Sequence, residues 1–433
     1  MRREIDMRRD CIAPHLVLIR ATYSLHMLTV VFALCLVVLS AMPASAEPLT
    51  LAQAVERART ASPLREGASA LADGARLAAT YAGRPLNPSA DVRIENLTPR
   101  SNPIVERDIF AVVNQPIEIG GKRTLRRDLA GADRDVAALV LRTIERQVAL
   151  DTVHAYMHAV RARDALATVV SQQEGVATLV TTMRRRVEEG FSAESDLLRF
   201  ETEASRLTVE HTRTAIELAR ALQELGTLMG AAAPLAVDQL VSPASVEVPS
   251  LDDSAIVDAA SQRPDVQLTM LRWQRAKVAA DLERQRRLPD PAISAGYKRT
   301  QGHDTAVAGV AMAIPLFERN AQNIAVSLAA ARAAEADHEA GRLRAAAEAR
   351  SALTAARALA AAAANLQRDL LAPAEGVRNA AQAMFREGAT DVLKLVDAER
   401  VYADVRRDAL SLAVDAYVAA IDARFALAQE QIP

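Results

Sequence analysis

The sequence predicts a mainly α-helical protein with a small β part, built as two copies of one unit. Three observations predict this fold class. Only 3% of the residues are aromatic, two stretches of more than about 60 residues keep a helical pattern, and landmarks recur at a spacing of about 200 residues. Short segments with a period of two add four strands to the helices.

The composition excludes several classes of protein. The chain has 433 residues, with 52 basic against 54 acidic side chains, and 50% of its residues are hydrophobic. A formal charge of −2 offers no broad basic surface for nucleic acid, and the apolar fraction is too high for a disordered chain. We therefore expect a folded protein with ample material for a core.

Residues 1–46 have the pattern of a secretory signal peptide. Five arginines precede an apolar run from Met27 to Leu39, and the small-residue triplet 44–46 follows it. The apolar run is shorter than the ~20 residues that a membrane-spanning helix needs. We therefore expect cleavage after Ala46 rather than a retained membrane anchor.

Both cysteines of the chain, Cys11 and Cys35, lie within this predicted signal peptide. The mature chain is therefore expected to have no disulfide and no thiolate nucleophile. Its stability must come from packing or from assembly with other chains.

Four pairs of landmarks recur between the two halves of the sequence. Two pairs are 201 residues apart, the third 199 and the fourth 198, which is close to a constant offset. Two copies are too few for a solenoid. We therefore predict a duplicated fold, with a first structural repeat over residues 47–250 and a second over residues 251–433. The pairs are Pro63 and Pro264, Pro88 and Pro289, Pro116 and Pro315, and Gly190 and Gly388.

Each repeat contains one very long helix and a shorter return helix. The helical pattern runs from Gly121 to about Glu188 and from Asn320 to about Arg386, and the return helices are expected at about 194–229 and 391–429. A helix of some 65 residues extends on the order of 100 Å, which is far beyond a globular domain. We therefore expect these helices to pack side by side as a coiled coil or a tube, with small residues between them.

A pair of strands precedes each very long helix. Apolar and polar residues alternate in Ala90–Glu95, and Ile293, Ala295 and Tyr297 alternate with Ser294, Gly296 and Lys298; the pattern is less clean in Ile109–Asn114. In the fourth segment Ala306, Ala308, Val310, Met312 and Ile314 alternate with Val307, Gly309, Ala311 and Ala313. A strand that is charged on one face and apolar on the other suits water on one side and lipid on the other. Four strands cannot close a barrel in lipid, so closure requires several chains, and three copies would supply twelve strands.

The helical turns and the strand-to-helix junctions resemble those of a known family. The segments 189–198 and 387–398 resemble the two periplasmic helical turns of the outer-membrane efflux protein family, the TolC-like channels. The segments 115–123 and 314–320 are similar to the junctions of its CzcC-like branch, which serves heavy-metal cation exporters. The residues that carry the resemblance are Gly190 and Gly388 at the turns, and Pro116, Gly120, Gly121 and Pro315 at the junctions.

The resemblance implies a long-helix α-barrel tunnel joined to a trimeric, twelve-stranded transmembrane β-barrel. The implied location is the outer membrane of a Gram-negative bacterium, with the helical tunnel in the periplasm. The implied partners are outer-membrane lipid, two further copies of the chain, a periplasmic adaptor (membrane fusion) protein and an inner-membrane pump of the resistance-nodulation-division (RND) type. The expected function is passive conduction of exported solute in a tripartite efflux system, with heavy-metal cations as the expected cargo.

Charged side chains just after the glycine turns form the predicted pore entrance: Asp196, Asp391, Lys394 and Asp397. Polar side chains that point into the tunnel form rings through threefold symmetry. In the family an acidic pair constricts this end, and Lys394 replaces the first acid here, which weakens the case for a simple cation-attracting double ring. Two interpretations stay open: Lys394 pairs with Asp391 or Asp397 and locks the closed state, or these charges form a solvated helix face.

Other candidate sites carry less weight. His154 and His158 stand one helical turn apart and could present two imidazoles to one metal, but no third ligand is evident, so two ordinary helix residues are the favoured interpretation. Gly120-Gly121 before a helix could form an anion cradle, but a strand-to-helix junction explains the pair better. No hydrolase or zinc-protease motif occurs in the sequence, so we predict no enzyme, no cofactor and no metal site.

Two rival functions remain. The outer-membrane duct of a multidrug efflux or type I protein-secretion system shares the expected fold and is not distinguished by the sequence. A periplasmic adaptor or structural coiled coil is disfavoured, because an adaptor hairpin has no need of four amphipathic strands. Outward loops are expected at Leu97–Arg107 and Thr300–Asp304.

Overall fold

The structure is a computed structural model that describes residues 48–96, 107–231, 235–237, 240–243, 246–390 and 392–432. The chain divides into the units Met1–Leu49 and Thr50–Pro433, and every helix and strand below belongs to the second unit. Three predicted features lie outside the described residues: the signal peptide, residues 97–106 of the first outward loop, and Asp391.

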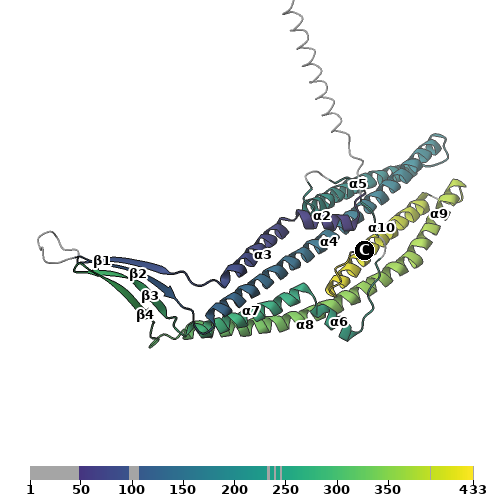
Figure 1. Cartoon of the computed structure of the whole chain (residues 1–433). Coiled ribbons are helices and arrows are strands. Elements are labelled where there is room, and N and C mark those ends of the chain that lie inside the picture. Colours follow the sequence, from purple (N-terminus) through teal and green to yellow (C-terminus); the bar gives the residue numbers. More distant parts are fainter. Residues whose placement is uncertain are drawn as a thin grey trace, which may run out of the picture. The chain divides into compact units, whose positions relative to one another are not determined.

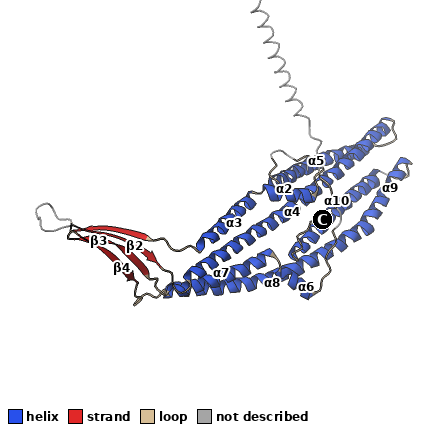
Figure 2. Cartoon of the chain, in the orientation of Figure 1, coloured by secondary structure: helices blue, strands red, loops and turns tan. Residues whose placement is uncertain are grey.

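Helices dominate the unit, and one small sheet lies at one end of it (Figures 1 and 2). The predicted mainly α fold with a small β part is confirmed. The two halves of the chain share one order of elements, and the division into two repeats stays a prediction. The first half contains α2 (Leu51–Ala61), α3 (Pro63–Ala82), β1 (Ser89–Glu95), β2 (Asp108–Pro116), α4 (Lys122–Glu188) and α5 (Glu194–Leu228). The second half contains α6 (Asp253–Ser261), α7 (Pro264–Arg286), β3 (Ala292–Thr300), β4 (His303–Ala311), α8 (Ala321–Leu366), α9 (Ala372–Arg386) and α10 (Val392–Ala426).

A proline separates the two short helices in each half. Pro63 occupies the first turn of α3, and the hydroxyl of Ser62 caps that helix by accepting from the Arg65 N–H at 3.4 Å. Pro264 occupies the first turn of α7. The first turn tolerates proline because its N–H groups have no partner within the helix and the fixed φ suits a helix start. Each proline therefore begins a new helix where the apolar pattern alone would continue the old one.

The first very long helix is continuous, whereas the second is not. α4 extends without a break over 67 residues, as the sequence predicts. Between α8 and α9 lies a π-helical turn, Gln367–Leu371. Pro373, just after it, has no N–H to donate to the carbonyl of Asp369, and its ring crowds the preceding turn; a π turn relieves both effects. The predicted helical extent is thus confirmed but its regularity is not.

No helix in the described part of the chain is long and apolar enough to cross a membrane.

The four strands form one antiparallel sheet in the order β1-β2-β3-β4. Val92 lies opposite Ala111, Ala111 opposite Tyr297, and Tyr297 opposite Ala306. Directly opposed residues of antiparallel strands share a face. The register therefore gathers the alternating apolar residues of all four strands on one face, which confirms the predicted alternation. This face is open, since Val92 is 73% exposed.

The connection between β3 and β4 is shorter than predicted. Only Gln301 and Gly302 separate the strands, and both have positive φ, 51° and 77°. Two-residue turns of this kind match the twist of antiparallel strands. The expected outward loop Thr300–Asp304 is therefore wrong in extent, because its flanking residues continue the ladder and Thr300 pairs with His303.

The second strand of this hairpin also ends early. β4 ends at Ala311, so Met312 and Ile314, which continue the alternating pattern, lie beyond the strand. β3 provides no residue before Ala292 to pair with them, because Ala292 already pairs with Ala311. The alternation of residues thus extends further than the ladder that it predicts.

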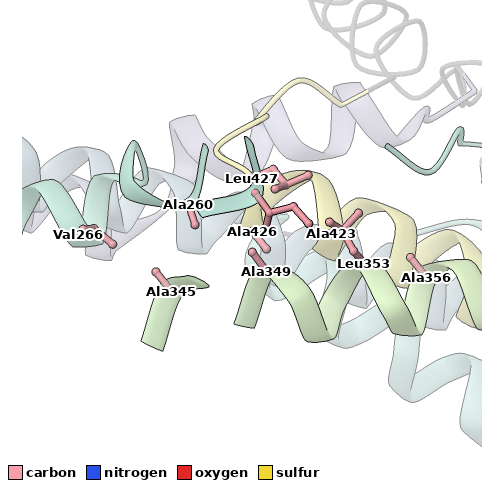
Figure 3. Close-up of a cluster of buried hydrophobic side chains, with 10 residues drawn as sticks. Ala260, Val266, Ala345, Ala349, Leu353, Ala356, Ala423, Ala426 and Leu427 are labelled. Carbon is pink, nitrogen blue, oxygen red and sulfur yellow. The ribbon is translucent and has the colours of Figure 1, made fainter. Parts of the chain in front are cut away.

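Small residues let the helices of the second half approach closely. One buried cluster joins α6, α7, α8 and α10 (Figure 3). Ala349, Ala356 and Ala423 are fully buried in it, and Leu353 fills the space between them. Alanine permits this approach because its side chain is a single methyl group. The expected packing of long helices through small residues is confirmed.

Candidate functional site

The two glycine turns have the same hydrogen-bond geometry. Gly190 and Gly388 adopt positive φ of 80° and 75°. After each glycine, an N–H returns to a carbonyl five residues earlier, from Phe191 to Arg186 and from Ala389 to Met384, both at 2.8 Å. This is the Schellman motif, in which glycine ends a helix at no steric cost. Each turn therefore ends a long helix and starts its return helix at the predicted place.

The two turns lie at the same end of the unit, where the ends of α4, α5, α9 and α10 gather (Figure 1). A buried apolar cluster joins the α4–α5 hairpin to the α9–α10 hairpin. Its members are Met183, Phe200, Phe385, Val392 and Leu395. The two halves of the chain therefore meet at the site that the sequence predicts for the pore entrance.

Three members of the predicted entrance set are described. Asp196 lies half-buried in the first turn of α5, where the helix dipole favours a negative charge. Lys394 and Asp397 are exposed in the first two turns of α10. Asp397 lines a groove of about 430 Å³ between α5 and α10, together with Arg199 and further residues of both helices. The fold therefore brings the starts of the two return helices together.

Glu203 is a member of this site that the sequence analysis missed. It is only 9% exposed, and its carboxylate accepts from Arg206 at 2.7 Å and from Arg400 at 2.8 Å. Burial would raise the pKa of Glu203, but the hydrogen bonds from the two guanidinium groups outweigh it and hold that pKa below its ordinary value. The acid is therefore charged and ties α5 to α10. The spacing along the sequence reveals only the nearby partner Arg206. Nothing in the sequence indicates that residues 203 and 400 lie close together.

A second pair of contacts repeats between the halves. Arg184 donates to Glu201 at 2.9 Å, and Gln382 donates to Glu399 at 2.5 Å. Donor and acceptor are 17 residues apart in both cases, and both members shift by 198 residues between the halves. Each contact bridges a long helix and its return helix just behind the glycine turn. The 198-residue offset of the turns could have identified this pair in the sequence.

The strand-to-helix junctions also correspond. Gly121 precedes α4 with φ 75°, and Asn320 precedes α8 with φ 61°. Asparagine tolerates this left-handed conformation better than most residues, and its side chain here donates to Glu283. Gly120 also has a positive φ, 69°, and a Cβ there would in addition lie 2.9 Å from a methyl group of Leu288.

The two junction prolines do not occupy equivalent places. Pro116 is the last residue of β2 and pairs with Ala292. Pro315 lies four residues beyond the end of β4, in the connection to α8. Pro116 therefore ends a strand whereas Pro315 does not, because the β3–β4 ladder stops at Ala311.

Lys122, which follows the glycine pair, links the two halves. Its side chain is almost fully buried, pairs with Asp290 at 2.7 Å and donates to the carbonyl of Leu288. Asp290 also accepts from the Ile119 N–H at 2.9 Å. The glycine pair therefore belongs to a strand-to-helix junction, as predicted, and the structure adds that this junction is tied to the second half of the chain. An anion cradle is not needed to explain the pair.

The two histidines of α4 each face a different helix. His154 Nε2 lies 2.8 Å from Asp422 of α10, and His158 Nε2 lies 3.0 Å from Glu217 of α5. The hydrogen bond with Asp422 raises the pKa of His154 above its ordinary value, against the opposing effect of burial. Within the described ranges, no group of three or more His, Cys, Asp or Glu side chains is placed to hold a metal ion.

The chain is similar in sequence to outer membrane efflux proteins and to metal resistance proteins. Residues 255–429 match the family described as outer membrane efflux protein. The chain is 27% identical over 327 residues to the cobalt-zinc-cadmium resistance protein CzcC of Cupriavidus metallidurans, covering 72% of this chain and 75% of that protein. It is 28% identical over 267 residues to the nickel and cobalt resistance protein CnrC of the same organism, covering 60% of this chain and 62% of that protein.

A solved structure shares the fold. The chain superposes on the crystal structure of CusC, a transmembrane channel protein, with a TM-score of 0.74 over 87% of this chain and 91% of that one, at 18% sequence identity. The chain therefore shares the arrangement of long paired helices and a small sheet with the CusC structure.

Proposed function

Because the chain carries an outer membrane efflux protein domain over residues 255–429, we propose that it is the outer-membrane channel of a tripartite RND-type efflux system. In this proposal the four strands lie in the outer membrane and the helices form a tunnel in the periplasm. A signal peptide, residues 1–46, directs export. Solute passes without covalent chemistry, and the energy comes from the inner-membrane pump through a periplasmic adaptor.

The observation that carries the proposal is the four-stranded sheet. Its alternating apolar residues share one face, and β1 and β4 form its two edges. Edge strands present unpaired backbone groups, which lipid cannot satisfy. Pairing of β4 with β1 of a neighbouring copy satisfies them, and three copies make a closed barrel of twelve strands. A homotrimer therefore provides both the barrel and the helical tunnel.

We place the pore entrance at the glycine turns Gly190 and Gly388. The charged set Asp196, Asp391, Lys394 and Asp397 then surrounds the threefold axis, where the tunnel is narrowest. Support comes from the meeting of α5 and α10 at this end and from the exposure of Lys394 and Asp397. Charges repeated by symmetry around a narrow pore act on every ion that passes.

The proposed cargo is heavy-metal cations. The relatives named above are cobalt-zinc-cadmium and nickel-cobalt resistance proteins. A passive conduit does not need a binding site of its own for the ion, because a selective pump delivers the cargo. Multidrug efflux and type I protein secretion are the alternatives that the test must separate.

Two measurements test the proposal. The gene is deleted, and growth is compared under zinc, cobalt, nickel, cadmium and organic drugs; loss of tolerance to metals alone is expected, and loss of tolerance to drugs alone would contradict the cargo. Purified protein is then inserted into planar bilayers, and Lys394→Ala and Asp397→Ala are compared with the parent. We expect changed ion selectivity or closure. Unchanged conductance, selectivity and closure in both variants would remove the entrance assignment.

A further inference from the structure

The connection from β4 to α8 forms a pocket with the end of α7. The pocket has a volume of about 540 Å³. Its lining combines arginines with large apolar side chains, namely Arg286, Arg287, Arg319, Ile314, Leu316 and Phe317. This part of the chain joins the sheet to the helices (Figure 1).

The apolar side chains of this pocket are unusually exposed. Phe317 is 98% exposed, Ile314 75% and Leu316 68%. Contact of three neighbouring large apolar side chains with water is unfavourable in free energy, by roughly 25 cal/mol per Å² of exposed apolar surface. This exposure indicates that something apolar covers the segment in the working protein.

Two of the three arginines that line the pocket have no acidic partner among the described residues. Among the described residues, Arg287 makes no ion pair, and the one described partner of Arg319 is the carbonyl of Pro315, at 3.4 Å. Arg286 pairs with Glu283. Glu318 is the one acid in the lining. The pocket therefore has an excess of positive charge beside an apolar surface.

At the first junction, which occupies the corresponding place, the cations are paired. There Lys122 pairs with Asp290, and Arg126 pairs with Glu118 at 2.6 Å. Glu118 corresponds to Phe317 at the 199-residue offset, so an ion-pair partner in one half is replaced by an exposed ring in the other. Of the two described junctions, the second therefore combines unpaired arginines with an exposed ring, whereas at the first Lys122 and Arg126 are paired.

We propose that this pocket, which we call the basic pocket, binds an anionic phospholipid of the membrane, with the phosphate at Arg287 and Arg319 and an acyl chain on Ile314, Leu316 and Phe317. The inference rests on the proposed function, which places the sheet in the membrane and therefore the junction at its periplasmic surface. A guanidinium binds phosphate through two parallel hydrogen bonds and is weakly hydrated, which suits an interface. An anionic phospholipid provides both a phosphate for the arginines and a long apolar chain for the exposed side chains.

The test is lipid binding by the full-length mature trimer in mild detergent. Native mass spectrometry counts bound lipid during titration with phosphatidylglycerol or with phosphatidylcholine of the same acyl chains. The parent is compared with Arg287→Gln/Arg319→Gln. The matched control is Arg332→Gln/Arg344→Gln, which removes two exposed arginines without ion pairs from α8. Each basic residue near a membrane surface contributes about fivefold in affinity, so the pocket variant, which lacks two, should bind phosphatidylglycerol ~25-fold more weakly.

Each result has one meaning. Preference for phosphatidylglycerol that is lost in the pocket variant and kept in the control supports the basic pocket. Equal binding of both lipids by the parent, or equal loss in both variants, overturns it while leaving the channel intact. Dissociation of the pocket variant into monomers with unchanged lipid binding overturns it as well, because the segment would then be covered by a neighbouring copy. Insertion of the parent into vesicles is measured separately. Failure to insert at all would instead refute the proposed function.

Discussion

Glu203 of α5 and Arg400 of α10 form an ion pair at 2.8 Å, although 197 residues separate them in the sequence. Glu203 is buried, whereas the side chain of Arg400 is 51% exposed. The pair therefore joins the two hairpins beside the apolar cluster of Met183, Phe200 and Leu395.

Glu203→Gln should destabilise the protein more than Arg400→Gln. Without the carboxylate both arginines lose a charged hydrogen-bond acceptor, whereas without Arg400 the acid keeps Arg206 at 2.7 Å. We expect a loss of about 1–3 kcal/mol for Glu203→Gln and about 1 kcal/mol or less for Arg400→Gln. Denaturant unfolding of the detergent-solubilised protein measures both. A larger loss of stability in Arg400→Gln would show that the burial of Glu203 does not decide which substitution is more destabilising.

The contact between His154 and Asp422 should make stability depend on pH. The contact raises the pKa of His154 above 6.5, so its stabilisation is fully present below pH 6.5 and is lost as the pH rises through the raised pKa. We expect the melting temperature of the parent to fall more between about pH 5.5 and about pH 8.5 than that of His154→Gln. Thermal melting at a series of pH values measures this difference. Parallel pH profiles for the two proteins would contradict the prediction.

Gly388→Ala should destabilise the second helical turn through backbone strain alone. A methyl group at Gly388 meets nothing within 4 Å, but φ there is +75°. We expect a loss of about 1–2 kcal/mol, with a smaller loss for Gly388→Asn because asparagine tolerates this conformation.

Gly175→Ala is the matched control for this variant. Gly175 lies inside α4, also with nothing within 4 Å, and alanine there should stabilise the helix by up to about 1 kcal/mol. Opposite signs in unfolding measurements confirm the interpretation. Stabilisation by both substitutions would mean that the turn accommodates alanine by changing its conformation.

Lys122→Met should loosen the strand-to-helix junction. The substitution preserves much of the side-chain volume but leaves Asp290 with the Ile119 N–H as its remaining described partner. Removing one member of a buried ion pair typically costs about 3–5 kcal/mol, and the partial exposure of Asp290 places the expected loss near about 2–3 kcal/mol. Hydrogen exchange of residues 117–125 should increase. The double variant Lys122→Met/Asp290→Asn should recover part of the stability, and no recovery would show that the two side chains act independently.

Local features of the sequence predicted most of the elements. Alternation identified all four strands, helical periodicity identified α4, α5 and α10, and the glycines placed both turns. The failures are also local in origin. The pattern through Met312 and Ile314 continued past the strand, because alternation records which residues suit a face and not where a pairing partner ends. Pro373 interrupted the second long helix, since a missing N–H changes the backbone whatever the surrounding periodicity.

The sequence by itself determined the kinds of element, their order, the place of each turn and the apolar face of the sheet, because these depend on residues that are close together along the chain. Only the tertiary structure decided which turns of α5 and α10 face each other, and so that Glu203 is held by Arg400. It also decided that the cations at the first junction are paired while Arg287 at the second is not. These contacts depend on the rotation of one helix about its axis relative to another. That rotation is fixed by packing across the whole unit, where a shift of a single residue turns a side chain by about 100°.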